Sequence, residues 1–382
     1  MIAQECNSFS VDMFKKEKKE KIFVALSGGV DSAVAAYLLK QEGHEVLGGF
    51  IKGYNVDGCQ DSDAEDAAKV AAHLDIPFYV FDMEKEYEKR VVDYLLDGYK
   101  KGVTPNPDVV CNSEIKFGLF YDQAMKLGAD AVASGHYAIL KPRMHLYEAK
   151  DKTKDQSYFL WQVPKERLEK ILFPLGKLKK DTVRAIARKA GLPNADKKDS
   201  QGICFLGKFD FNEFLKEKLG AKEGDVVDVV GNVIGSHYGV HLYTIGQRHG
   251  FVNKTNKPLY VIAKDVARNT LTAVHEWDDE LNTDQFITRG VMMLDVRSEK
   301  KLKDGEVIRV YGRCRYHQPA FACDVRMGGS RNGVSLPPVA GENLLVTLKK
   351  RQAIFPAAGQ SFVMYTGRGK VLGGAIIQGY EN

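Results

Sequence analysis

The sequence predicts an α/β protein: a doubly wound parallel sheet in the N-terminal half, then two β-rich units. Short apolar runs alternate with helical patterns up to about residue 210, and hairpin-like strand pairs punctuated by glycines follow. We expect a flexible tail, a catalytic domain, a small central β-rich module and a C-terminal β-barrel. Their expected bounds are 1–20, 21–210, 211–283 and 284–382.

The N-terminal half alternates between strand and helix patterns. Apolar runs predict buried strands at 22–26, 46–51, 78–81 and 131–133. Apolar residues at helical spacing predict helices at 30–38, 64–74 and 182–190. Such alternation favours a parallel sheet with helices on both faces.

The C-terminal half contains strand and turn signals. Val226 to Val230 and Val233-Ile234, separated by Gly231-Asn232, predict a hairpin. Another strand pair is expected within 259–274. Further glycines are expected to separate strands of the barrel: Gly305, Gly328-Gly329, Gly359 and Gly373-Gly374.

Bulk composition restricts the environment and the partners. No apolar run reaches the eighteen residues of a membrane span, so we expect a cytoplasmic protein. The net charge of +5 permits nucleic-acid binding without requiring it. Six cysteines without a CxxC pair fit a reducing compartment with free thiols. They stand at 6, 59, 111, 204, 314 and 323.

The strongest functional signal is a glycine-rich turn between the first strand and the first helix: Ser27-Gly28-Gly29-Val30-Asp31-Ser32. A strand, such a turn and a helix N-terminus form an anion site, because backbone N–H groups converge and the helix dipole favours negative charge. The two glycines let the backbone approach phosphates closely. Both serines add hydroxyls, and Asp31 is suited to orienting the loop or holding Mg²⁺.

Two familiar phosphate loops are excluded by the residues. A Walker loop ends in Gly-Lys-Ser/Thr, and a dinucleotide fingerprint needs G-x-G-x-x-G; the segment contains neither. It resembles the Ser-Gly-Gly-x-Asp-Ser loop of the ATP pyrophosphatases, which split ATP between the α and β phosphates and pass AMP to a substrate oxygen. The resemblance implies ATP as cosubstrate, with Mg²⁺ arriving on ATP and no metal fixed by the protein.

Two later segments carry reactive side chains. Asp108 and Cys111 lie three residues apart within residues 104–112, a spacing that puts a carboxylate and a thiol on one face of a turn. Cys204 lies within Asp199-Ser200-Gln201-Gly202-Ile203-Cys204-Phe205. Both cysteines stand in polar, Pro/Gly-bounded segments that we expect to be loops, which favours a chemical role over a core filler.

With these segments the sequence resembles the family of bacterial tRNA-specific 2-thiouridylases over roughly residues 21–380. The motifs occur in that family's order: the phosphate loop, Asn106-Pro107-Asp108-Val109-Val110-Cys111-Asn112, Ser134-Gly135-His136-Tyr137, Lys154-Asp155-Gln156-Ser157-Tyr158-Phe159-Leu160, the Cys204 segment and Gly246-Gln247-Arg248. The resemblance implies an enzyme, a tRNA-uridine 2-sulfurtransferase. Such an enzyme adenylates O2 of the wobble uridine and replaces it with sulfur, giving 2-thiouridine, AMP and pyrophosphate.

The resemblance also implies roles for individual residues. Cys111 would be the nucleophile, Cys204 the persulfide carrier and Asp108 the acid/base, with a transient Cys111–Cys204 disulfide. ATP would be contacted by Ala25, Leu26, Ser27, Gly28, Gly29, Val30, Asp31, Ser32, Ile51 and Gly135. Methionine is often seen where this chain has Ile51. The target base would meet Asn106, Pro107 and Asp108.

The order of the sulfur steps stays open. Cys111 attacks the persulfide and releases sulfide, or the persulfide attacks C2 and Cys111 resolves the product; either route needs a reductant afterwards. A rival arrangement uses Asp108, Cys111 and Cys204 as ligands of an iron–sulfur cluster.

The RNA partner is expected to lie along the β-rich half. Lys154, Asp155, Gln156, Arg315 and Tyr316 resemble the family's tRNA contacts. Plausible phosphate partners are Arg248, Lys197, Lys198 and the basic run Lys349-Lys350-Arg351. The family suggests tRNAs for glutamate, lysine and glutamine, with sulfur from a cysteine desulfurase or a relay protein.

Two other functions fit parts of the sequence. A ligase that adenylates a small carboxylate or amide would share the loop but has no use for the two cysteines. A non-catalytic tRNA-binding protein would carry a vestigial loop, against which the intact Ser27, Asp31 and Ser32 argue.

Overall fold

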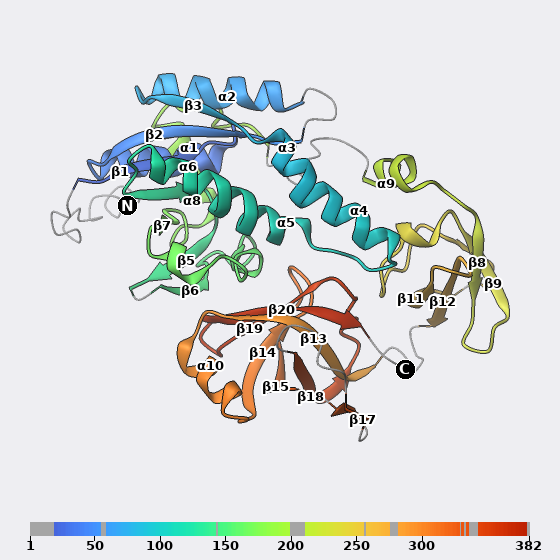
Figure 1. Cartoon of the computed structure of the whole chain (residues 1–382). Helices are drawn as coiled ribbons and strands as arrows, with labels where there is room; N and C mark the ends of the chain where they lie inside the picture. Colours follow the sequence, from blue (N-terminus) through green and yellow to red (C-terminus); the bar gives the residue numbers. More distant parts are fainter. Residues whose placement is uncertain are drawn as a thin grey trace, which may run out of the picture.

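The computed structural model describes residues 19–54, 59–142, 144–198, 211–255, 257–275, 282–328, 330–331, 334–335 and 343–379. Within these residues the chain forms an α/β domain, a small central β module and a closed barrel. Figure 1 shows the barrel below the α/β domain and the central module beside both. No helix among the described residues is long and apolar enough to cross a membrane.

The α/β domain is built on a parallel sheet. Its described strands, in sheet order, are β3 (Phe78–Asp82), β2 (Glu45–Lys52), β1 (Lys21–Ala25), β4 (Ala131–Ser134) and β7 (Ile171–Leu172). All pairings are parallel. The four predicted strands are confirmed. The short β7 was not predicted, because two apolar residues carry no periodicity.

Helices cover both faces of this sheet, as the doubly wound prediction requires. One face carries α1 (Val30–Gln41), α2 (Cys59–His73) and α8 (Lys180–Lys189). The other carries α3 (Glu84–Tyr87), η1 (Glu88–Val92), α4 (Asp93–Lys100), α5 (Pro107–Val110), η2 (Cys111–Phe120) and α6 (Tyr121–Lys126).

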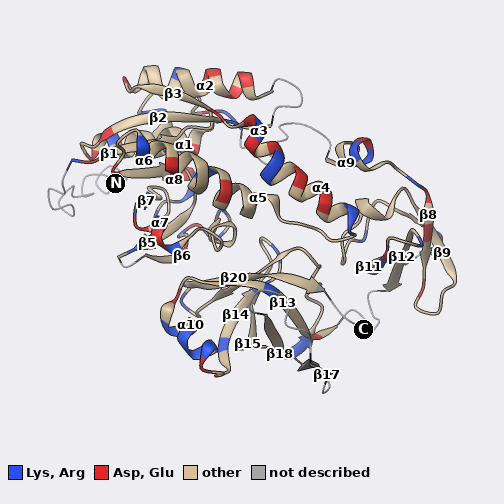
Figure 2. Ribbon diagram, in the orientation of Figure 1, with Lys and Arg blue, Asp and Glu red and all other residues tan. Residues whose placement is uncertain are grey.

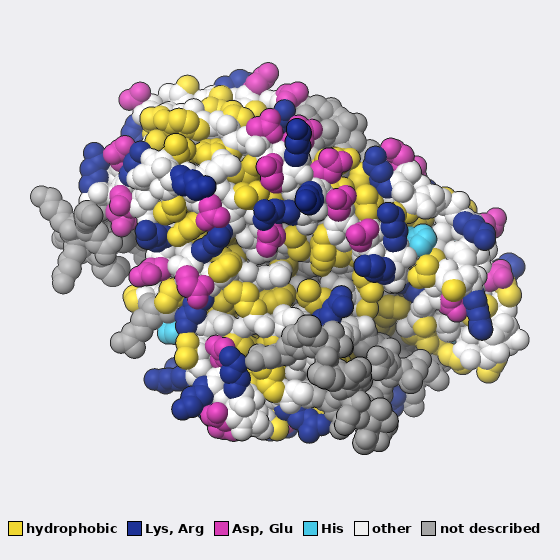
Figure 3. Space-filling model, viewed as in Figure 1, with side chains coloured by type: hydrophobic (Ala, Val, Ile, Leu, Met, Phe, Trp, Pro, Cys, Tyr) yellow, Lys and Arg dark blue, Asp and Glu magenta, His cyan; other side chains and the backbone are white. Residues whose placement is uncertain are grey.

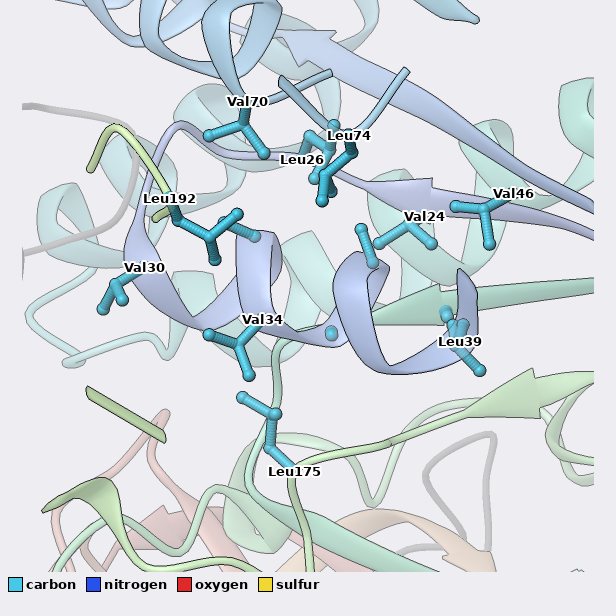
Figure 4. Packing of buried hydrophobic residues seen from close by; sticks show 14 of the residues in the cluster. Val24, Leu26, Val30, Val34, Leu39, Val46, Val70, Leu74, Leu175 and Leu192 are labelled. Carbon is cyan, nitrogen blue, oxygen red and sulfur yellow. The ribbon is translucent and has the colours of Figure 1, made fainter. Parts of the chain in front are cut away.

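Alternation along the central strands creates the two cores. Ile22 and Val24 of β1 pack with α1, whereas Phe23 between them packs into the cluster on the opposite face. Figure 4 shows residues of the first core, with Val34 of α1 beside Leu175 and Val24 of β1 beside Val46 of β2. These side chains are almost fully buried, so the phosphate loop between β1 and α1 stands on a rigid base.

The central module is a mixed sheet. Its strands, in sheet order, are β10 (Val252–Asn253), β9 (Val233–His237), β8 (Gly224–Val227), β12 (Thr270–His275) and β11 (Leu259–Asp265). The predicted hairpin is β8–β9, but its first strand ends at Val227 rather than Val230. The Asp228 carboxylate accepts hydrogen bonds from the backbone N–H groups of Val230 and Asn232, which turns the chain earlier. Preceding the sheet, α9 (Phe211–Leu219) packs Phe214 and Leu215 into the α/β domain.

The C-terminal unit is the predicted barrel. Its six strands in the described chain are antiparallel and follow the order β13 (Thr283–Met293), β18 (Leu344–Gln352), β15 (Phe321–Met327), β14 (Ile308–Arg313), β19 (Ser361–Tyr365) and β20 (Val371–Gly379), which closes onto β13. One expectation was wrong: Gly373-Gly374 lie within β20 and do not separate strands. A Cβ on Gly374 would lie 2.5 Å from the Trp161 ring, so glycine is needed there for packing.

The barrel is joined to the α/β domain through a shared core. Trp161 donates from Nε1 to Ser361 Oγ at 3.0 Å, and the Tyr158 hydroxyl donates to the Ser361 carbonyl at 2.9 Å. Arg313 of β14 binds Glu148 of β6 (His145–Glu148) at 2.6 Å. Figure 3 shows hydrophobic side chains gathered where the two domains meet. Residues of the barrel are therefore expected to line any pocket between the two domains.

Candidate functional site

The phosphate loop has the geometry of a preformed anion site. Gly28 adopts φ +73°, and a Cβ there would lie 2.5 Å from the carbonyl oxygen of Asp63, so only glycine fits. The Ser27 backbone N–H donates to Ser32 Oγ at 3.1 Å, and Ser32 Oγ donates to the Gly29 carbonyl at 3.0 Å. These bonds fix the turn at the N-terminus of α1, where the first backbone N–H groups of a helix lack partners within the helix and can bind an anion.

The loop lies at the point where the sheet changes direction. The chain runs from β1 outward to β2 and β3, then returns to β4 on the other side of β1. Ligands of doubly wound sheets bind at the carboxyl ends of strands flanking such a point. Gly135 follows β4 and touches the loop, since a Cβ on it would lie 2.7 Å from the Ser32 nitrogen. The sequence-predicted residues of the loop and Gly135 are therefore brought together.

Not every predicted ATP residue faces the loop with its side chain. Leu26 and Val30 are 2% and 3% exposed and belong to the core beneath α1, so they can offer only backbone groups to a nucleotide. Ala25 ends β1, and Ile51 lies near the end of β2; both pack against the core on the opposite face of the sheet.

Three residues at the loop were missed by sequence reasoning. Lys180 Nζ lies 2.8 and 2.7 Å from the two carboxylate oxygens of Asp31, and the Tyr137 hydroxyl donates to the same carboxylate at 2.8 Å. Asn194 Nδ2 donates to the Gly28 carbonyl at 2.9 Å. Tyr137 belongs to a motif that could have signalled it. Lys180 lies 149 residues beyond Asp31, and Asn194 lies 166 residues beyond Gly28. No local sequence pattern marks either of them.

A second concave site lies between the α/β domain and the barrel. It is a cavity of about 190 Å³. Its lining combines aromatic rings with a few polar groups: Leu95, Tyr99, Thr104, Pro105, Asn106, Pro107, Asp108, Tyr158, Phe159, Phe211, Tyr316 and Gln360. The Phe159 and Tyr316 rings lie 4.5 Å apart, and Gln360 Nε2 donates to the Thr104 carbonyl at 2.9 Å. Flat apolar walls with directed polar groups suit an unstacked nucleobase.

Asp108 and Cys111 lie on a continuous helical segment, not in the loop that the sequence suggested. Asn106 caps α5, its Oδ1 accepting from the Val109 N–H at 3.4 Å, and Cys111 begins the π-helix η2. Residues three apart share one helix face, so Asp108 and Cys111 still lie on the same side of the segment, as predicted. Prolines at 105 and 107 suggested a loop, but proline is well tolerated in the first helical turn.

The two reactive side chains have different surroundings. Burial raises the pKa of the Asp108 carboxyl, and the charge of Lys116 partly opposes this shift. Cys111 is 4% exposed and belongs to the apolar cluster against which Ala25, Ile51 and the pocket residue Phe211 pack. One apolar cluster thus contains Cys111 and reaches both the end of β1, at Ala25, and the aromatic pocket, at Phe211.

Cys204 lies outside the described residues, and with it the disulfide to Cys111 and the third ligand of the rival iron–sulfur arrangement. Within the described ranges, no three His, Cys, Asp or Glu side chains gather as a metal site. Cys111, Cys314 and Cys323 are not in disulfides in the described chain. Cys314 and Cys323 are buried in the barrel core, as expected of structural thiols.

The predicted tRNA contacts divide into two groups. Tyr316 lines the aromatic pocket, and Arg315 donates to the Ile245 carbonyl, which ties the barrel to the central module. Asp155 is 5% exposed and accepts from the Ala149 and Ser157 N–H groups, so its carboxylate organises its own loop. Gln156 Oε1 accepts from the Tyr137 N–H at 3.0 Å.

The expected phosphate partners also differ in availability. Lys197 is held by Asp63 and Asp66 at 2.8 and 2.7 Å, which removes much of its charge from an RNA partner. Lys198 and Arg248 are exposed, and Lys349 pairs with Asp324 on the barrel. Figure 2 shows further lysine and arginine positions along α10 (Val296–Lys303).

His136, beside the loop, predicts a pH dependence of stability. Burial, aided by the Lys116 charge, holds its pKa well below 6.5, and its Nδ1 lies 2.8 Å from Ser134 Oγ. Below pH 6.5 the unfolded chain takes up a proton that the folded chain refuses, so the free energy of unfolding should fall by up to about 1.4 kcal/mol per pH unit. Urea unfolding of the wild type and His136→Gln at about pH 7.5 and about pH 5.5 measures this slope.

The variant His136→Gln should show a smaller slope, with the remainder coming from residues such as His237, whose pKa is also lowered by burial. His249→Gln, at an exposed position of the central module, is the matched control and should keep the wild-type slope. Equal slopes for His136→Gln and the wild type would contradict the prediction.

The fold and loop define a class, the nucleotide-binding HUP domains coupled to β domains. A family model described as the tRNA methyl transferase HUP domain matches residues 20–208, and one described as the tRNA methyl transferase PRC-barrel domain matches residues 212–275.

Relatives aligned along nearly the whole chain narrow this class. The chain is 40% identical to the tRNA-specific 2-thiouridylase MnmA of Ligilactobacillus salivarius, covering 96% of this chain and 98% of that protein. It is 41% identical to MnmA 2 of Aliarcobacter butzleri, with coverages of 95% and 100%. For the MnmA of Streptococcus sanguinis the identity is 40%, with coverages of 95% and 97%. This chain belongs to the family of tRNA-specific 2-thiouridylases.

Proposed function

We propose that this protein is a tRNA sulfurtransferase that uses ATP to replace O2 of the wobble uridine with sulfur. The observation that carries the proposal is one helical segment that joins two sites. Its first turn, with Asp108, lines a pocket suited to a base, and Cys111, one turn later, packs in the cluster that Ala25 and Ile51 of the nucleotide end also touch. Family membership supplies the reaction class, and this arrangement supports the roles of the residues.

ATP activation is assigned to the phosphate loop. A uracil carbonyl oxygen is a poor leaving group, so O2 first attacks the α phosphate and pyrophosphate departs. The backbone N–H groups at the start of α1 and the hydroxyl of Ser27 bind the phosphates, while the Ser32 hydroxyl holds the turn. A magnesium ion carried by ATP would neutralise phosphate charge.

The target base is assigned to the aromatic pocket. A wobble uridine must leave the anticodon stack to enter it, and rings such as Phe159 and Tyr316 replace the lost stacking. The burial-raised pKa of Asp108 keeps a proton on its carboxyl to higher pH than for an ordinary aspartate. Such a group can exchange protons with the base as O2 is activated.

Sulfur transfer is assigned to Cys111 and Cys204 by either of two balanced routes. In the first, the Cys111 thiolate attacks Cys204 Sγ of the persulfide, a disulfide forms and hydrosulfide leaves to attack C2. In the second, the terminal persulfide sulfur attacks C2, and Cys111 then attacks Cys204 Sγ and frees the thiocarbonyl. In both, the C2–O2 bond breaks, AMP leaves and a thiol reductant later restores the pair.

The decisive experiment is nucleoside mass analysis of tRNA after incubation with the protein, ATP, a cysteine desulfurase and cysteine. We expect 2-thiouridine at the wobble position of tRNAs for glutamate, lysine and glutamine, with AMP and pyrophosphate released. Pyrophosphate release that needs tRNA separates this function from a small-molecule ligase. If neither 2-thiouridine nor pyrophosphate forms while tRNA still binds, the result would instead favour a non-catalytic binding protein.

The rival cluster mechanism calls for a separate test. Protein purified without oxygen is analysed for iron and acid-labile sulfide, and its activity is measured with the desulfurase as sulfur source. Full activity without iron supports the persulfide routes. Activity that scales with bound iron would replace them with a cluster held by Asp108, Cys111 and Cys204.

A further inference from the structure

Lys180 occupies an unusual place for a lysine. It is the first residue of α8, it is 9% exposed, and its ammonium lies 2.8 and 2.7 Å from the two oxygens of Asp31. Burying an ammonium is unfavourable unless it is paired, so the position must be supported by a specific arrangement. Here the partner of Lys180 is Asp31, a residue of the phosphate loop.

The location of Asp31 defines what Lys180 can reach. Asp31 lies in the first turn of α1, where the free backbone N–H groups and the helix dipole favour an anion. The hydroxyl of Tyr137, from the segment after β4, reaches the same carboxylate at 2.8 Å. An ammonium within hydrogen-bonding distance of this carboxylate is therefore also at the edge of the phosphate site.

The helix that carries Lys180 is fixed independently of the pair. The Lys180 backbone N–H donates to Asp151 Oδ2 at 3.0 Å, which caps the start of α8. Val183 and Ala187 of the same helix are fully buried in the core that also holds α1. Because the backbone is anchored, only the side chain of Lys180 can move. Its flexible four-carbon stem allows the ammonium to shift a short distance from the Asp31 carboxylate toward a bound phosphate.

We propose that Lys180 binds the β and γ phosphates of ATP and stabilises the departing pyrophosphate, supplying the cation that the loop itself lacks. The inference deepens the ATP step of the proposed function and rests on it. Before ATP binds, Asp31 pairs with the ammonium. The ammonium compensates the negative charge of this carboxylate in the loop. With ATP bound, the ammonium lies between the carboxylate and the phosphates.

The charge balance explains why such a group is needed. As O2 of uridine forms its bond to the α phosphorus, the bond from that phosphorus to the bridging oxygen breaks, and negative charge accumulates on the leaving pyrophosphate. Backbone N–H groups supply partial charges, and a positioned ammonium adds a full one. A purely structural Lys180 would neutralise Asp31 and make no contact with the nucleotide.

The experiment compares three ligands, because they separate the two roles. Calorimetry measures the binding of ATP, pyrophosphate and AMP to the wild type, Lys180→Met and Lys180→Arg. We expect Lys180→Met to bind ATP and pyrophosphate about 10- to 100-fold more weakly, the loss of one charge-assisted hydrogen bond. AMP should bind within about 3-fold of the wild type, and Lys180→Arg should recover part of the loss. Lys179→Met, at the exposed neighbouring position, is the control and should match the wild type.

A second pair of variants protects against misfolding of Lys180→Met, which leaves Asp31 without its ammonium. Asp31→Asn alone is compared with Asp31→Asn/Lys180→Met, where no buried charge is uncompensated. Compared with Asp31→Asn, we expect the double variant to bind pyrophosphate about 10- to 100-fold more weakly, because it lacks the hydrogen bond from Lys180 to the phosphates. Unchanged pyrophosphate binding, or an equal loss of AMP binding, would assign Lys180 a structural role and overturn the proposal.

The outcomes also separate this inference from the proposed function. If the wild type binds neither ATP nor pyrophosphate, the ATP step itself fails. If the wild type binds both and forms 2-thiouridine, while Lys180→Met binds both equally well, only the assignment of Lys180 fails.

Discussion

Replacing Cys111 by serine is expected to lower 2-thiouridine formation by roughly a thousandfold or more, because a serine hydroxyl cannot attack the persulfide or resolve the sulfur bond. The phosphate loop is untouched by this change, so tRNA-dependent pyrophosphate release should continue. The measurement is parallel: labelled pyrophosphate from ATP, and thiolated nucleoside by mass spectrometry. Continued ATP cleavage without thiolation would separate activation from sulfur transfer in one variant.

Cys323→Ser is the matched control, since Cys323 is buried in the barrel core and is not among the residues that line the pocket. It should retain thiolation, and Cys204→Ser should lose it as Cys111→Ser does. If Cys111→Ser retained thiolation, the thiol would be a core residue of the cluster in which it is buried, and the sulfur route would need another nucleophile. If it lost pyrophosphate release as well, Cys111 would be needed to build the site.

The turn between β1 and α1 was predictable because its signals are local. Strand, glycines and helix follow one another in the sequence, and the hydrogen bonds within the turn join Ser27, Gly29 and Ser32. What escaped prediction came from a distance. Lys180 reaches Asp31 only because α8 packs beside α1 on the same face of the sheet, a tertiary fact without a periodic signature.

The pocket shows the same division more sharply. Asn106, Pro107 and Asp108 were predicted from one segment, but the walls opposite them come from Tyr316 and Gln360 of the barrel. Gln360 lies more than 250 residues beyond Thr104, whose carbonyl it binds. The two prolines misled the local assignment, because proline in the first turn of a helix and proline in a loop look alike in sequence.

Gly135→Ala is expected to abolish detectable ATP binding, a loss of roughly a hundredfold or more, through displacement of backbone. The added Cβ would lie 2.7 Å from the Ser32 nitrogen and 2.8 Å from the Asp31 carbonyl carbon. Neither is the end of a flexible side chain, so the loop at the start of α1 must shift and its N–H groups lose their aim at the phosphates. Binding is measured by calorimetry with ATP, and the fold by circular dichroism and thermal unfolding.

Gly43→Ala provides the contrast that assigns the effect to the loop. Gly43 follows α1 with φ +88°, and a Cβ there meets nothing within 4 Å. Its substitution should cost about 1 kcal/mol of stability through backbone strain and leave ATP affinity unchanged. A Gly135→Ala protein that binds ATP normally would mean that the segment after β4 can retreat from the loop. The nucleotide would then be positioned by β1 and α1 alone, and the close approach of β4 would not be part of the site.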